Sequence, residues 1–332
     1  MKEIICAARS SLPILFLVQI LLPKDYMKTI LAILLLLPLT LGAAILHVAL
    51  DGSQAYSSVQ IAVNAAAEQD TILIHPGTYY ENIEIIGQKL TIGSLELTTA
   101  DSTYITQTVI DAHQSGSCFS ITEASEVILQ GLYLTNGIGT PSPNWGDRKG
   151  GAILAFDSRL NIVNCHIIGN RARAGAGIYL TNCSASLAGT VIAFNRGKAS
   201  GALAFGGYSL DGIKTLEFDP LNRCSIYNNI AGVLGNDITI ISQFYNSIDI
   251  YLNKATVAAT SPYLKECIYT EQYDPQQEFH YNVFINETAI QQQFADLYVS
   301  RDSPPRQSLV SVTCDKAVEE KWAKQCFYAS NP

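Results

Sequence analysis

Charged residues are scarce in this sequence. Asp, Glu, Lys and Arg together make up 15% of the 332 residues, whereas hydrophobic residues make up 48%. So few charges exclude a disordered tail and suit a chain with a long buried interior. The 29 acidic residues outnumber the 21 basic ones, and the net charge of −8 excludes a nucleic-acid binder that acts through its bulk charge.

Cysteine is also sparse, and its spacing lacks the patterns of metal-binding modules. No Cys-x-x-Cys occurs, and the number of cysteines beyond Ala44 is odd. We therefore expect neither a zinc module nor a disulfide scaffold, and most of these side chains should be small buried apolar groups. They are Cys118, Cys165, Cys183, Cys224, Cys267, Cys314 and Cys326.

The N-terminal region has the pattern of a secretory signal. An apolar run from Ile30 to Leu41 follows Lys28 and precedes Gly42-Ala43-Ala44. A basic start, an apolar middle and a small-residue end predict export, so residues 1–44 are interpreted as a targeting region whose true start is Met27. If the segment stayed uncleaved, it would be the one contact with a membrane, at the short limit for a span.

A repeat of 25 residues runs through the middle of the chain. Residues 151–170 align with residues 176–195, and both copies read apolar-x-x-small-x-Ile-x-x-Asn. Another copy ends at Asn229, and a looser one at Asn136. Each copy holds short alternating strands separated by Gly and Asn, without enough helix for a crossover. The pattern predicts an all-β solenoid, a β-helix in which each copy is one coil.

Stacked coils would place equivalent residues in columns at strand spacing, about 4.8 Å. One predicted apolar column consists of Leu129, Ile162, Leu187 and Leu221, and the next of Leu134, Ile167, Ile192 and Ile226. A third column consists of Asn170, Asn195 and Asn229. Asn tolerates the left-handed conformation of a tight corner, and stacked amides can hydrogen-bond between coils. We expect these asparagines to be structural rather than ligand-binding.

The repeat also suggests how the chain is divided. Residues 45–252 form the expected β-helix, residues 253–295 a C-terminal cap or small β region, and residues 296–332 an irregular tail that resembles the start of a truncated next unit. An amphipathic helix is expected from Ser57 to Ala67, with capping-box spacing between Ser57 and Gln60. This helix would cover the open end of the first coil, which could otherwise template aggregation.

Two parts of the sequence resemble a known protein family. The stretch from Val59, through Asp70-Thr-Ile-Leu-Ile-His-Pro-Gly77, to Glu81 resembles the opening of pectin-lyase-like proteins. Gly-Gly-Ala-Ile at 150–153, its variants and the Ile-x-x-Asn endings are similar to the repeats of polymorphic outer-membrane proteins. The resemblance covers roughly residues 45–250 and implies a right-handed parallel β-helix with an N-terminal cap helix. It is not specific for any reaction.

The enzymes of that family have active-site motifs that are incomplete here. Gly77-Thr-Tyr-Tyr-Glu81 matches an element of pectin methylesterases, but no Gln-Asp or Asp-Phe follows it. The Gly-His-Gly element and the close Asp pair of polygalacturonases are absent, so no carboxylates can be assigned to glycoside hydrolysis. Calcium needs several oxygen ligands, and the central coils have no acidic cluster. We therefore assign no metal site and no cofactor, although a lyase could use calcium.

A basic segment stands out in this acidic chain. Residues 148–200 contain seven basic residues and one acidic residue, Asp157. Six of the basic residues fall at the corner between an Asn ending and the next Gly-x-Ile strand: Arg148, Lys149, Arg171, Arg173, Arg196 and Lys198. Stacking would align them as a stripe, and Arg forks suit carboxylates or sulfates. The preceding loop, from Gly139 to Asp147, should protrude and offers Trp145 for stacking on a sugar ring.

These features favour an exported or cell-surface β-helix that binds carbohydrate as a non-catalytic, adhesin-like scaffold. The predicted ligand-binding residues are Trp145 and the six cations of the stripe, and the expected partner is an acidic polysaccharide or surface glycan. The alternative is a polysaccharide lyase acting on a uronate glycan, with Arg171, Arg173 or Lys149 as the base. A simple solvated surface remains a third interpretation of the stripe.

The acids Asp211, Glu217 and Asp219 are expected to be a solvated insertion rather than a cation site, and His166 is not expected to be catalytic.

Overall fold

The computed structural model describes residues 42–141, 146–207, 215–232, 235–242, 247–254, 268–272, 280–285, 298–299 and 310–314. Apart from Gly42, Ala43 and Ala44, the predicted targeting region lies outside these residues, as does the end of the predicted tail. Three short helices are described: α3 (Val59–Ala65), α4 (Glu96–Thr99) and α5 (Thr103–Gln107).

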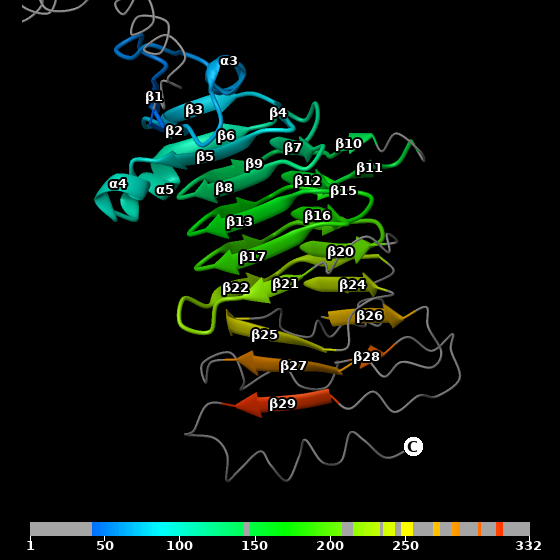
Figure 1. The fold of residues 1–332 in the computed structure, drawn as a ribbon. Coiled ribbons are helices and arrows are strands. Elements are labelled where there is room, and N and C mark those ends of the chain that lie inside the picture. Colours follow the sequence, from blue (N-terminus) through cyan, green and yellow to red (C-terminus); the bar gives the residue numbers. More distant parts are fainter. Residues whose placement is uncertain are drawn as a thin grey trace, which may run out of the picture. The chain divides into compact units, whose positions relative to one another are not determined.

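The strands stack into three long parallel sheets (Figure 1). The first sheet has the order β1 (Ile45–Val48), β2 (Thr71–Ile74), β5 (Lys89–Ser94), β8 (Glu126–Gln130), β13 (Arg159–Val163), β17 (Ser184–Ala188) and β21 (Leu216–Phe218). The second has the order β4 (Ile83–Ile86), β7 (Phe119–Thr122), β12 (Ile153–Phe156), β16 (Ile178–Thr181), β20 (Leu203–Gly207), β24 (Ile238–Ser242), β26 (Ile268–Gln272) and β28 (Tyr298–Val299). The third has the order β3 (Gly77–Tyr80), β6 (Thr108–Asp111), β9 (Tyr133–Thr135), β14 (His166–Ile168), β18 (Val191–Ala193), β22 (Cys224–Tyr227), β25 (Ser247–Lys254), β27 (His280–Ile285) and β29 (Val310–Cys314).

From β2 to β22, each turn of the chain contributes one strand to each of the three sheets. The chain runs from β12 through β13 and β14 to β16, and β16 lies directly beside β12. The register pairs Ile153 with Ile178 and Ile162 with Leu187, which is the 25-residue offset of the repeat. The fold is therefore a right-handed parallel β-helix, as the sequence predicted.

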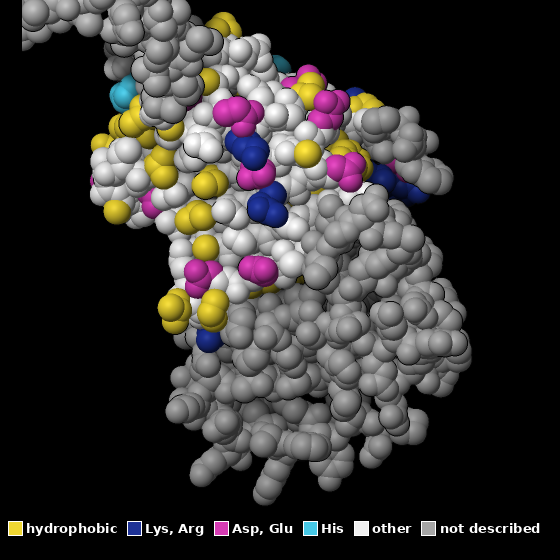
Figure 2. All heavy atoms as spheres, in the orientation of Figure 1, with side chains coloured by type: hydrophobic (Ala, Val, Ile, Leu, Met, Phe, Trp, Pro, Cys, Tyr) yellow, Lys and Arg dark blue, Asp and Glu magenta, His cyan; other side chains and the backbone are white. Residues whose placement is uncertain are grey.

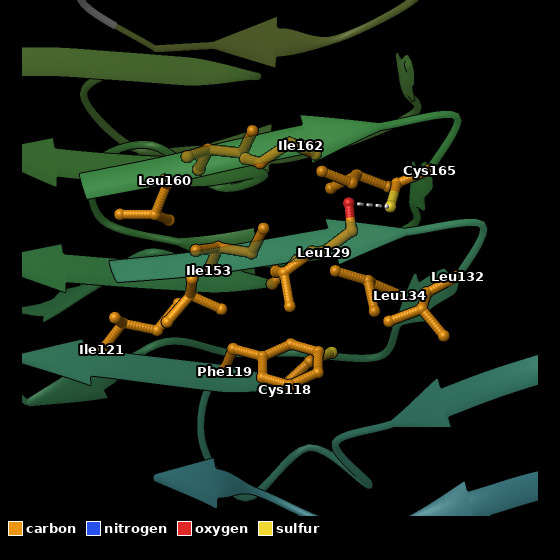
Figure 3. Packing of buried hydrophobic residues seen from close by; sticks show 14 of the residues in the cluster. Cys118, Phe119, Ile121, Leu129, Leu132, Leu134, Ile153, Leu160, Ile162 and Cys165 are labelled. Carbon is orange, nitrogen blue, oxygen red and sulfur yellow. Dashed lines mark hydrogen bonds between the residues drawn. The ribbon is translucent and has the colours of Figure 1, made fainter. Parts of the chain in front are cut away.

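The interior is filled by the predicted apolar columns, with one exception. Leu129, Ile162 and Leu187 are fully buried in adjacent coils, and Leu134, Ile167, Ile192 and Ile226 form the second column (Figure 3). The assignment of Leu221 was wrong, because Leu187 pairs with Phe218 and Leu221 is 95% exposed. Phe218 lies six positions before Cys224, whereas Leu187 lies three before Thr190, so the corner between β21 and β22 is longer than its predecessors.

The asparagine column is a buried hydrogen-bonded ladder, as predicted. Asn170 Nδ2 donates to Asn195 Oδ1 at 3.1 Å, and Asn195 Nδ2 donates to Asn229 Oδ1 at 3.0 Å. The reason given for asparagine was wrong, because none of the three has a positive φ. The left-handed corner residue precedes each of them: Gly169, Phe194 and Asn228. The looser copy is displaced by one residue, since Asn136 is itself a left-handed corner residue and Gly137 N–H donates to Asn170 Oδ1.

The amphipathic helix is α3, which begins two residues later than the predicted segment. Val59, Ala62 and Val63 are buried in the core, as the sequence pattern indicated. The predicted capping box was wrong, because Ser58 is the N-cap and accepts from Ile61 N–H. A second residue, Glu81, also caps the N-terminus of α3, although it lies beyond β3 (Gly77–Tyr80) in the sequence. Its carboxylate accepts from Val59 N–H, Gln60 N–H and the Ser58 hydroxyl, each at 2.9 Å.

Parallel pairing continues beyond residue 252. Strand β25 pairs with β27, which in turn pairs with β29, and β24 pairs with β26. Strand β27 lies within residues 253–295, the region expected to form a C-terminal cap or small β region. The boundaries proposed for the C-terminal region stay predictions.

Candidate basic stripe

The corner that follows the asparagine ladder carries a short sheet of its own. It consists of β15 (Arg171–Ala172), β19 (Arg196–Gly197) and β23 (Ile230–Ala231), all parallel. The buried Asn170 precedes exposed Arg171, and the period of two in extended chain brings Arg173 to the same outer face. The next coil repeats this with Asn195, Arg196 and Lys198.

The predicted cations of neighbouring coils are therefore stacked. Arg171 pairs in register with Arg196, so two residues of like charge lie on adjacent strands, whose backbones are about 4.8 Å apart. Arg173 lies between Arg148 and Lys198, because its N–H donates to the Arg148 carbonyl at 2.8 Å and its carbonyl accepts from Ala199 N–H. We call these five exposed residues, Arg148, Arg171, Arg173, Arg196 and Lys198, the basic stripe.

Two of the stripe residues have partners in the described chain. Arg173 Nη1 forms an ion pair with Asp147 Oδ1 at 2.8 Å. Arg148 Nη1 donates to the Gly139 carbonyl at 2.8 Å and to the Ser115 carbonyl at 3.3 Å. Arg171, Arg196 and Lys198 form no ion pair with any described residue. The stripe therefore keeps most of its positive charge facing solvent.

Lys149 was predicted to belong to the stripe, but its side chain turns away from the outer corner. Its ammonium donates to the Tyr179 hydroxyl at 3.0 Å and lies 4.6 Å from the centre of the Tyr179 ring. The half-buried Lys149 is thus fixed on β16 by a hydrogen bond and a cation–π contact. No signal in the sequence pointed to Tyr179, because the contact joins neighbouring coils.

The protruding loop begins and ends as a hairpin. Strand β10 (Thr140–Pro141) pairs antiparallel with β11 (Arg148–Lys149), and Figure 1 shows both at the edge of the stacked coils. Trp145, the predicted sugar-stacking residue, lies outside the described residues. In Figure 2, Lys and Arg side chains lie together at the edge over β11, beside atoms that are not described.

A second column that contains basic residues, on the first sheet, also contains an acidic residue between them. On the first sheet, Glu126 pairs in register with both Lys89 and Arg159, and Lys89 forms an ion pair with Glu126 at 3.1 Å. Figure 2 shows the alternation of acidic and basic side chains on this face. In this described column the stacked charges alternate in sign, whereas Arg171 and Arg196 stack with like charge.

The cysteines, His166 and the three acids that the sequence singled out lie in different surroundings. Burial raises the pKa of Cys118, Cys165 and Cys224 to about 12, which makes these thiols poor nucleophiles. His166 is half-buried against the edge of Tyr133, and burial lowers its pKa. Asp219 accepts from the N–H groups of Leu221 and Asn222 and so holds the long corner, Glu217 is exposed on β21, and Asp211 lies outside the described residues.

Sequence reasoning missed one polar pair, His47 and His75. Their ring nitrogens Nδ1 and Nε2 lie 3.0 Å apart on adjacent strand ends. Burial, and then the neighbouring His47, lower the pKa of His75. Within the described chain, no three His, Cys, Asp or Glu side chains gather where they could hold a metal ion.

Comparison with known proteins identifies similar folds only. No protein-family model and no curated protein matches the sequence. Among solved structures, carrot pectin methylesterase is similar with 15% identity and a TM-score of 0.40, covering 84% of this chain and 85% of that one. The Aspergillus niger pectin methylesterase is similar with 16% identity and a TM-score of 0.38, covering 82% and 86%. Another pectin methylesterase, solved in complex with a hexasaccharide, has 12% identity and a TM-score of 0.29, covering 85% and 96%.

Of the helices in the described ranges, each is too short or too polar to cross a bilayer.

Proposed function

We propose that this protein is an exported or cell-surface β-helix that binds an acidic polysaccharide through the basic stripe, as a non-catalytic scaffold. The observation that carries the proposal is the in-register stacking of Arg171 on Arg196 without an acidic partner among the described residues. Stacked like charges destabilise a sheet. An anionic chain lying along the stripe would neutralise them while the Arg forks bind its carboxylates or sulfates.

The geometry of the stripe suits a linear polyanion better than a small ligand. Its cations repeat from coil to coil along the solenoid, at about 4.8 Å for each coil. The outer face is exposed, so repeated acidic groups could be contacted one after another along the stack. Trp145, in the adjoining loop, would add a sugar-stacking contact in this proposal.

Binding is tested with the full chain on immobilised polygalacturonate. Wild-type protein should be retained and released by salt, because exposed ionic contacts are screened. The double variant Arg171→Ala and Arg196→Ala should elute at clearly lower salt. Arg159→Ala is the matched control, since it also removes an exposed stacked Arg but from the column that contains Glu126. Equal elution of the double variant and wild type would refute the role of the stripe.

The alternative function, cleavage of a uronate polymer by a lyase, uses the same surface. A lyase base must be neutral to accept a proton. Two of the three candidate bases are already engaged by other side chains, Arg173 by Asp147 and Lys149 by Tyr179. Incubation of polygalacturonate with the protein and calcium should leave the ultraviolet absorbance flat. A steady rise from unsaturated uronate would replace the scaffold proposal with the lyase.

A further inference from the structure

The carboxylate of Asp70 is nearly buried and has no cationic partner among the described residues. Asp70 is 6% exposed and lies immediately before β2. Two backbone N–H groups donate to it, Ala44 to Oδ1 at 2.7 Å and Ala67 to Oδ2 at 2.8 Å. The ion pairs of the described chain join Lys89 to Glu126 and Arg173 to Asp147. Since a carboxylate this buried is usually paired with a cation, Asp70 lacks an expected partner.

Ala44 is where the chain starts to hydrogen-bond into the β-helix. Its carbonyl accepts from Thr71 N–H at 2.8 Å, and the register of β1 with β2 begins one residue later, at Ile45. Gly42 and Ala43 are exposed, and neither forms a hydrogen bond within the described part of the chain. Among the described residues, hydrogen bonding into the β-helix therefore begins at the nitrogen of Ala44.

We propose that the exported chain is cleaved between Ala43 and Ala44, and that the new α-ammonium group of Ala44 forms an ion pair with the Asp70 carboxylate. This inference rests on the proposed export through the N-terminal segment. An endopeptidase of the export route would add water across the peptide bond. The C–N bond breaks, the hydroxyl joins the Ala43 carbonyl carbon, and the Ala44 nitrogen gains a hydrogen and then a solvent proton to become an ammonium.

The position of the cut follows from the geometry of Asp70. Cleavage after Gly42 would place the ammonium one residue, about 3.8 Å of chain, further from the carboxylate. Cleavage after Ala44 would remove the donor that Oδ1 now has. Cleavage after Ala43 keeps the existing 2.7 Å contact and gives it a charge. The small, exposed Gly42 and Ala43 also suit the end of a signal segment.

The charge would add stability only after processing. In the uncut chain the Asp70 carboxylate already accepts a charge-assisted hydrogen bond from Ala44 N–H, and the ammonium would add the attraction of opposite charges over the same contact. In the uncut chain Ala44 offers one amide N–H, whereas the ammonium offers three, and the two extra donors would face solvent because Ala44 is exposed. The first strand would thus be held most firmly in the mature protein.

The test starts from the full chain produced in a secreting host. Mass spectrometry of the purified protein should identify Ala44 as the first residue. The α-amine should then react with an acylating reagent about fivefold more slowly than an ordinary α-amine near pH 8, which corresponds to a pKa raised by about one unit. Asp70→Asn keeps the shape and one acceptor oxygen, and it should restore ordinary reactivity without moving the cleavage position.

Each other outcome has a defined meaning. A mature chain starting at Ala43 or Ile45 overturns the proposed site but leaves export standing. An uncut chain in the cytoplasm overturns both proposals, and an uncut chain in the membrane or medium overturns the cleavage alone. An ordinary α-amine pKa in the wild-type protein refutes the ion pair, and this measurement does not depend on whether Asp70→Asn folds.

Discussion

At the scale of single residues, the asparagine ladder joins neighbouring coils from the inside. Each amide in the middle of the ladder is fully used: Asn195 Oδ1 accepts from both the N–H and the Nδ2 of Asn170, and its own Nδ2 donates to Asn229 Oδ1 and to the Ile167 carbonyl. These groups are buried, so water cannot replace a lost partner. Loss of the Asn195 side chain would therefore remove hydrogen bonds to the coils on both sides and lower the stability of the protein.

Asn195→Ala should lower the free energy of unfolding by about 3 kcal/mol, because it leaves buried donors and acceptors unsatisfied. Asn161→Ala is the control, since Asn161 is exposed and accepts one long hydrogen bond from Ser186. Its effect should stay within about 0.5 kcal/mol. Urea unfolding of the two variants checks this, and equal midpoints would show that the ladder contributes little.

A second prediction concerns acid sensitivity. Burial and the adjacent His47 hold the pKa of His75 below its usual value, with Asp51 acting in the opposite direction. The unfolded chain takes up this proton near about pH 6.5, whereas the folded chain takes it up only at lower pH, so protonation favours unfolding. Stability should fall as the pH drops from about 6.5 through the lower folded-state pKa, and burial of His166 acts in the same direction.

His75→Gln should make this dependence shallower. The measurement is the urea midpoint at about pH 7.5 and about pH 5 for the variant and wild type. An unchanged difference between the two pH values would show that the histidine pair does not govern acid stability.

Asp147 offers a gain-of-binding test at the stripe. Its carboxylate is the one described acidic group that forms an ion pair with a stripe residue, at 2.8 Å from Arg173. Asp147→Asn should release that guanidinium and raise the affinity for polygalacturonate several-fold. Arg173→Ala should lower it. Weaker binding by Asp147→Asn would mean that Asp147 positions the Arg rather than competing for it.

At the scale of secondary-structure elements, α3 depends on a carboxylate that is remote in the sequence. Glu81 accepts from three donors at the start of the helix, where the helix dipole also favours a negative charge. The Gly77-Thr-Tyr-Tyr-Glu81 element that suggested pectin methylesterases thus has a structural use in this chain. A spacing rule within the helix could not reveal it, which is why Ser57 and Gln60 were assigned instead.

Glu81→Ala should destabilise the protein by about 2 kcal/mol, since two helix N–H groups and a hydroxyl lose their acceptor. Glu84→Ala is the control, because the Glu84 side chain is exposed and only its backbone contacts Gln60. Thermal unfolding of both variants decides the matter, and similar melting temperatures would argue against the cap.

The strands were easier to predict than the corners. Columns such as Ile167 and Ile192 follow from a repeat of constant length, because each coil pairs with the one before it. Leu221 failed because the corner that Asp219 holds is longer, and a sequence offset cannot reveal where the extra residues lie. The left-handed conformation was assigned to the asparagines, but it belongs to the residue before each of them. Residue type could not reveal this, since even Phe194 adopts that conformation.

At the scale of the whole molecule, the protein is acidic but carries a basic stripe along one corner. The alignment of Arg171 with Arg196 could be predicted from the repeat, because their sequence offset equals one coil. The inward turn of Lys149 onto Tyr179 and the pairing of Arg173 with Asp147 could not, because both depend on side chains of other segments. The fold determines where the basic side chains lie on the surface, and their side-chain contacts determine how much of the positive charge has no ion-pair partner among the described residues.

The most direct test of the account is the affinity for polygalacturonate of three proteins: wild type, Arg171→Ala with Arg196→Ala, and Arg159→Ala. The account predicts that the double variant binds about tenfold more weakly, or about 1.4 kcal/mol, and that Arg159→Ala binds like wild type. The gap should close as salt rises. Equal binding by all three, or an equal loss in both variants, would contradict the proposal that the basic stripe is the binding site.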